Sequence, residues 1–136
     1  MKRVYSNVDQ GALLLTICHF SDITESRKDL SPESECLQAA AKKIPPGTKF
    51  RPHRHNEVVR NTRHTQEAWV VLQGRVLAKF YDLDDQIILE EELSAGSCAI
   101  VYRAGHGFEV LEDETVLYEF KSGPYFGSET DKEFID

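Results

Sequence analysis

The sequence has few cysteines, and those it has form no recognisable pattern. The chain contains only Cys18, Cys36 and Cys98. Their number is odd, they are widely spaced, and no CxxC pair occurs. Reduced thiols in a cytoplasmic protein therefore fit this sequence better than a disulfide framework.

The sequence also lacks a long apolar run and a basic stretch. The longest apolar run, Ala12–Cys18, is far shorter than the roughly 18 to 20 residues of a membrane helix. Met1–Arg3 is basic, but no apolar region with a cleavage site follows it, so we expect no signal peptide. The 16 Lys+Arg and 23 Asp+Glu residues give a formal net charge of −7. We therefore expect neither a membrane nor a nucleic acid as a partner.

What the chain does contain is typical of one globular domain. Its 136 residues are 40% hydrophobic and 29% charged, which is enough for a single buried core. From about Thr48 onward, short β-branched and aromatic runs alternate with turn residues. The expected strands are 68–72, 76–81, 87–89, 99–102, 108–111 and 115–120. Such short, regularly spaced strands predict an all-β sandwich or barrel.

Residues 32–43 allow two interpretations. Ser31 and Pro32 resemble the start of a helix, and residues 37–43 have high helix propensity. Propensity is a weak guide that tertiary contacts often override. An extended strand that leads into Pro45 fits the same residues, so the sequence alone leaves the choice open.

Two histidines separated by one residue are the first sign of chemistry. His53 and His55 flank Arg54, and residues i and i+2 of a strand project to the same face. Both imidazoles can therefore meet at one point inside a barrel. Neutral imidazole binds Zn, Fe, Ni, Cu and, with carboxylate help, Mn. The alternative interpretation of this motif is a solvated basic edge strand.

A carboxylate and a third imidazole complete a candidate metal site. Glu67 is expected to share a strand face with Trp69, and a buried Glu67 needs a charged or hydrogen-bonding partner. His106 has a glycine on each side, which lets the backbone turn sharply. Three histidines and one glutamate can hold a divalent transition metal and leave positions open for water or substrate.

These residues resemble the cupin family. Its first motif has the form Gly, five residues, His-x-His, a gap, Glu, six residues, Gly, and the matching positions are Gly47, His53, His55, Glu67 and Gly74. The gap, 56–66, is longer than in the family and implies a longer connection beside the mouth of the barrel.

The second cupin motif matches less completely. Gly96 fits, Tyr102 and Ala104 replace a proline and a glycine, and His106 comes one residue early. The stretches 118–125 and 131–134, like Pro52–His55, are similar to small cupin-fold metalloproteins encoded in bacterial O-antigen and surface-polysaccharide gene clusters.

The resemblance implies the fold, the cofactor and the assembly. It implies one all-β domain over 1–136, a double-stranded β-helix (cupin jelly-roll barrel) with its core at about 36–125 and an N-terminal extension, 1–35. It implies one divalent transition metal (Fe, Mn, Ni or Zn) inside the barrel, and usually a homodimer. The metal ligands would be His53, His55, Glu67 and His106.

Four further residues are candidates for contact with a small-molecule ligand. His64 lies close before Glu67 and is a candidate acid or base, with a solvated loop residue as the alternative. Arg51 can hold a carboxylate or phosphate by bidentate contacts. Trp69 and Tyr102 are candidates for the cavity wall, with packing as the alternative role.

Three functions fit these patterns. The first is a metal-dependent enzyme that acts on a small polar molecule, such as a sugar or nucleotide-sugar intermediate. The metal would polarise a carbonyl or hydroxyl for isomerisation, epimerisation or hydrolysis, and dioxygenase chemistry at iron is also compatible. The second is a non-catalytic module that binds a ligand or metal. The third is a metal-free sugar isomerase that uses His53 and His55 as acid and base.

Overall fold

The computed structural model describes residues 1–136 and is built almost entirely of β-strands. Helical structure is limited to one 3-10 turn, Phe20–Asp22, and one α-helical turn, α1 (Ser128–Asp131). The strands are β1 (Lys2–Tyr5), β2 (Leu13–Cys18), β3 (Lys28–Asp29), β4 (Ala40–Ala41), β5 (Glu67–Gln73), β6 (Arg75–Tyr81), β7 (Ile87–Ser94), β8 (Cys98–Val101), β9 (Gly105–Val110) and β10 (Val116–Lys121). All strand pairs are antiparallel, so the all-β prediction is confirmed.

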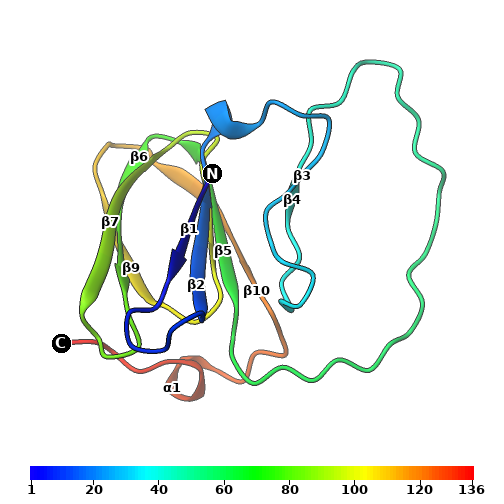
Figure 1. Ribbon diagram of the computed structural model, residues 1–136. Helices are drawn as coiled ribbons and strands as arrows, with labels where there is room; N and C mark the ends of the chain where they lie inside the picture. The colour runs from blue at the N-terminus through cyan, green and yellow to red at the C-terminus, as the bar shows by residue number, and fades with distance from the viewer.

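Two sheets face each other and enclose the core. The larger sheet has the order β1-β2-β8-β5-β10 and the smaller one has the order β7-β6-β9 (Figure 1). The main core cluster joins Leu15 of β2 and Val71 of β5 to Phe80 of β6 and Leu93 of β7. The structure does not close into a barrel, because β9 pairs only with β6 and β10 pairs only with β5.

The strands expected from the sequence after residue 66 are present. In β6, buried Val76, Ala78 and Phe80 alternate with less buried residues, as expected for a strand with one face on a core. Gly74 separates β5 from β6 with a φ of 76°, a conformation that favours glycine. The turns at Asp82–Asp85 and Ser94–Gly96 separate the next strands.

The expected N-terminal extension contains part of the larger sheet. β2 lies between β1 and β8, and all six of its residues are buried. Leu14, Leu15 and Ile17 of β2 belong to the main core cluster, and its two end residues, Leu13 and Cys18, belong to a second cluster that includes Leu30 and Tyr102. Burial on both faces explains why the sequence of β2 is a continuous apolar run rather than an alternating one.

Residues 32–43 do not form the helix that their propensity allowed. Their only regular element is β4, which pairs with β3. Leu37, Ala39 and Ala41 pack against the second cluster, and this spacing of two is the period of a strand. The Ser31 hydroxyl accepts a hydrogen bond from the amide of Ala39 (3.2 Å) instead of capping a helix. Tertiary contacts thus override helix propensity here.

The segment 42–66 has no helix or strand and runs away from the two sheets as a wide loop (Figure 1). All of its residues except Gln66 are exposed. It leads directly into Glu67, the first residue of β5. The structure contains no helix that is long and apolar enough to cross a membrane.

Candidate functional site

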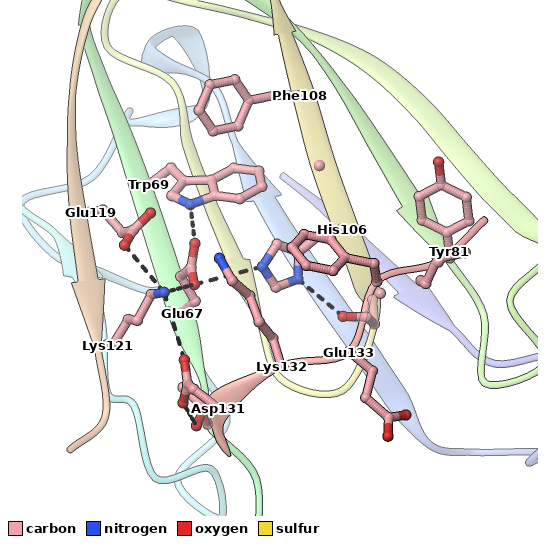
Figure 2. A pocket seen from close by; sticks show the side chains of 16 residues that line it. Glu67, Trp69, Tyr81, His106, Phe108, Glu119, Lys121, Asp131, Lys132 and Glu133 are labelled. Carbon is pink, nitrogen blue, oxygen red and sulfur yellow. Dashed lines mark hydrogen bonds and ion pairs between the residues drawn. The ribbon is translucent and has the colours of Figure 1, made fainter. Parts of the chain in front are cut away.

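A cavity of about 530 Å³ opens at one end of the two sheets. Glu67 and Trp69 of β5 line it from the larger sheet, His106 and Phe108 of β9 line it from the smaller sheet, and Lys121 lies at the end of β10 (Figure 2). The C-terminal residues after α1 complete the wall.

The Glu67 carboxylate is the centre of this cavity. Its side chain is only 8% exposed, and it accepts a hydrogen bond from the indole Nε1 of Trp69. The Nζ of Lys121 lies 3.1 Å from the carboxylate, and the Nε2 of His106 lies 3.6 Å from it. Lys121 and Glu67 are register partners across β5 and β10, so the sheet pairing places these two charges together. The expectation that a buried Glu67 has a charged partner is therefore confirmed.

The Glu67 carboxylate and its two basic neighbours shift one another's pKa values. Burial would raise the pKa of Glu67, but the hydrogen bond and charge of His106, followed by the bonds from Lys121 and Trp69, lower it to about 2. Burial would lower the pKa of His106, but its contacts with Glu67 and the Ala104 carbonyl outweigh burial and raise it. The pKa of Lys121 is raised for the same reason: Glu67 outweighs burial. The cavity thus holds a carboxylate between an ammonium and an imidazole whose pKa is raised.

His106 is held in a defined orientation. Its Nδ1 lies 3.1 Å from the carbonyl oxygen of Ala104, and donation of the Nδ1 proton to this oxygen leaves Nε2 directed at Glu67. The Trp69 ring packs edge-on against His106 and Phe108, with ring centroids 5.2 and 5.0 Å apart. The His106 side chain keeps 28% of its surface exposed.

The structure brings two of the four expected metal ligands together. Glu67 and His106 lie side by side in the cavity, whereas His53 and His55 lie on the exposed loop 42–66. The rings of His53 and His55 contact each other, with centroids 5.3 Å apart, and Nδ1 of His53 lies 3.0 Å from the Arg51 carbonyl. No group of three or more His, Cys, Asp or Glu side chains is placed to hold a metal ion. In this arrangement, the four residues do not fit a single ion.

The other expected ligand-contact residues have different positions. Trp69 is part of the cavity wall. Tyr102 is fully buried away from the cavity, with its hydroxyl 3.3 Å from that of Thr16. Arg51 lies on the exposed loop, and His64 borders a separate hollow of about 220 Å³.

Sequence reasoning did not single out Lys121 or the C-terminal residues that line the cavity. The need for a cation beside a buried Glu67 was readable from the sequence, but the choice of Lys121 depends on the register between β5 and β10. The C-terminal wall, including Asp131 and Ile135, follows no periodic pattern that assigns it to a site.

Comparison with family models, with curated proteins and with solved structures gave no match to this chain.

Proposed function

We propose that this protein is a metal-binding protein of the cupin type that acts on a small polar molecule, such as a sugar or nucleotide-sugar intermediate, in the cavity. The observation that carries the proposal is the meeting of Glu67 and His106, ligand-type side chains from opposite sheets, inside a cavity of about 530 Å³. Trp69 and Phe108 add apolar ring faces beside these polar groups. Apolar walls with a few convergent polar groups are typical of small-molecule sites.

The proposal includes the finer fold, a double-stranded β-helix, with His53 and His55 as the remaining metal ligands. The outer edge of β9 has unpaired backbone groups, and 42–66 is a long stretch of chain without strand pairing. A free edge favours pairing with an extended segment. Docking of residues 47–56 along β9 would add a strand to the smaller sheet and bring His53 and His55 towards His106. The homodimer implied by the cupin resemblance stays a prediction.

Metal analysis of the purified protein tests this proposal. We expect about one divalent transition metal per chain in the wild type after metal-replete expression, and a large loss in His53→Ala and Glu67→Ala. His64→Ala is the matched control, because it removes an imidazole from the same loop but outside residues 47–56, the segment proposed to dock on β9. A metal-free wild type would overturn the proposal, and full metal content in His53→Ala would exclude docking of the loop.

A metal-free enzyme is the second candidate, and one observation favours it. The Lys121 ammonium already supplies a positive charge 3.1 Å from the Glu67 carboxylate. In this alternative, His106 transfers a proton to or from the ligand, and Glu67 stabilises the protonated form of His106. His53 and His55 take no part, because they lie outside the cavity. A metal-free wild type that still isomerises a sugar would establish this alternative.

Catalysis itself is a separate question from binding. A non-catalytic module that binds a ligand or metal would use the same cavity. Binding of sugars or nucleotide-sugars, detected by calorimetry without any turnover, would favour the module. Product formation that is lost in both Glu67→Ala and His106→Ala would favour an enzyme.

A further inference from the structure

The C-terminal segment after β10 lies across the cavity. Residues 131–135 line the cavity, and Figure 2 shows Asp131, Lys132 and Glu133 on the side of the cavity where Lys121 and His106 project. The side chain of Ile135 rests against Gly105, where a Cβ would come within 2.3 Å of its Cδ1. Gly105 precedes His106, so the segment packs directly beside a residue of the site.

Two side-chain contacts hold this segment in place. The Thr65 hydroxyl donates a 2.9 Å hydrogen bond to Asp131, and the Lys121 Nζ lies 3.9 Å from the same carboxylate. Lys121 is the last residue of β10, and Thr65 lies at the end of the loop 42–66, two residues before β5 begins. Asp131 is therefore a latch that joins the C-terminal segment to the end of β10 and to the loop residue just before β5.

The rest of the segment is held weakly. The last backbone hydrogen bond that joins the chain to the sheets is from Ser122 to Gln66 (2.9 Å). Beyond it, the Thr130 amide bonds only to Gly127 within the segment, and the Phe134 side chain is 88% exposed. None of residues 123–136 is buried. A segment with few buried contacts and few backbone hydrogen bonds opens at low free-energy cost.

We propose that residues 127–136 are a lid over the cavity, which the Asp131 latch holds closed and which opens to admit the ligand. The lid deepens the proposed function, because it rests on the cavity being the ligand site. Lys121 contributes to both parts, since its ammonium contacts Glu67 in the cavity and Asp131 on the lid.

The single tryptophan of the chain reports on the lid without any ligand. Trp69 lines the cavity and is 2% exposed, so a small neutral quencher must enter the cavity to reach it. Acrylamide quenching of its fluorescence therefore measures how often the lid is open. Thr65→Val removes the hydrogen bond to Asp131 with little change in shape. We expect the quenching constant to rise by up to about five-fold, the factor that corresponds to a hydrogen bond of about 1 kcal/mol.

Two further variants make the result decisive. A chain that ends at Phe126 removes the lid without removing a buried residue, and it should show the largest quenching constant. Thr62→Val is the matched control, because Thr62 lies in the same connection but does not line the cavity, and it should match the wild type.

Wild-type quenching in the shortened chain, with an unchanged circular dichroism spectrum, would overturn the lid. This outcome is distinguishable from failure of the proposed function, because the quenching measurement needs neither metal nor substrate. Unchanged quenching in the shortened chain, together with normal metal content in the wild type, would reject the lid but not the proposed function.

Discussion

Glu67 makes the stability of the folded protein depend on pH in the acid range. Its pKa is about 2 in the fold, against 4.5 for an unperturbed glutamate. Because the folded-state pKa is the lower one, the stabilising contribution is fully present above pH 4.5 and is lost as the pH falls through 2. Substitution of Glu67 by glutamine keeps the shape of the side chain and removes the titration.

The magnitude follows from the pKa shift. Each pKa unit corresponds to about 1.36 kcal/mol, so the shift of Glu67 from 4.5 to about 2 stabilises the fold by about 3 kcal/mol at neutral pH. About 2 kcal/mol of this contribution is gone at pH 3 by the same linkage. The figure needs little discount for solvent screening, because the Glu67 side chain is only 8% exposed.

Urea unfolding at pH 7 and pH 3, in the presence of a chelator, measures this contribution. Between these two pH values, the wild type should lose about 2 kcal/mol more of its free energy of unfolding than Glu67→Gln. Glu119→Gln is the matched control, because its carboxylate also contacts Lys121 (3.3 Å) but is 45% exposed. We expect Glu119→Gln to follow the wild type within about 0.5 kcal/mol. Equal losses in the wild type and Glu67→Gln would refute the reasoning.

Two other substitutions test the parts of the fold that support the site. Leu15→Ala, at a fully buried position of β2, should lower the free energy of unfolding by roughly 2 to 5 kcal/mol, whereas Val8→Ala at a 56% exposed position should change it by less than about 0.5 kcal/mol. A small effect of Leu15→Ala in urea unfolding would mean that β2 is not an integral strand. Arg103→Leu leaves the nearly buried Glu35 carboxylate without the cation that lies 2.8 Å from it. The free energy of unfolding should fall by roughly 2 kcal/mol, less than for a fully buried ion pair, because Arg103 itself is one-third exposed. Arg27→Leu, in an exposed ion pair, should cost less than about 1 kcal/mol, and equal thermal shifts for the two arginine variants would contradict this difference.

The strands after residue 66 are predictable from the sequence because each is specified locally. Val76, Ala78 and Phe80 show the period of two, and glycine or aspartate residues mark the turns on either side. The same alternation places Glu67 and Trp69 on one face, which the structure confirms. The order in which the strands pair is not predictable from local patterns, because contacts between strands that are distant in the sequence decide it.

The N-terminal third is less predictable because its structure depends on what covers it. β2 has no alternation, since both of its faces are buried, and the residues that bury one face lie in segments such as 37–41. Those covering residues have high helix propensity, yet they are extended because Leu37 and Ala39 pack on the second cluster at strand spacing. Neither segment specifies its own structure without the other.

The candidate site shows the same division between local and distant information. The pairing of Glu67 with a histidine was readable from motif spacing, and His106 lies 3.6 Å from it. Lys121 was not readable, because it reaches Glu67 through the register of β5 and β10. The position of His53 and His55 relative to the cavity depends on whether 47–56 pairs with β9, and no local pattern in the loop specifies that pairing.

The side chains of His53 and His55 do not help to hold the observed fold together. Both are fully solvated on the loop, and the interactions they make are one ring contact with each other and one bond between His53 and the Arg51 carbonyl. Glu67, in contrast, is a buried charge that the fold must neutralise, and Lys121 and His106 do so at close range. A second positive charge near Glu67 would weaken the ion pair between Lys121 and Glu67, because like charges repel in a poorly solvated site. A metal ion bound at Glu67 would therefore move Lys121 away from the carboxylate. Glu119, 3.3 Å from the Lys121 Nζ, and Asp131, 3.9 Å from it on the lid, are the other acids that can receive its ammonium.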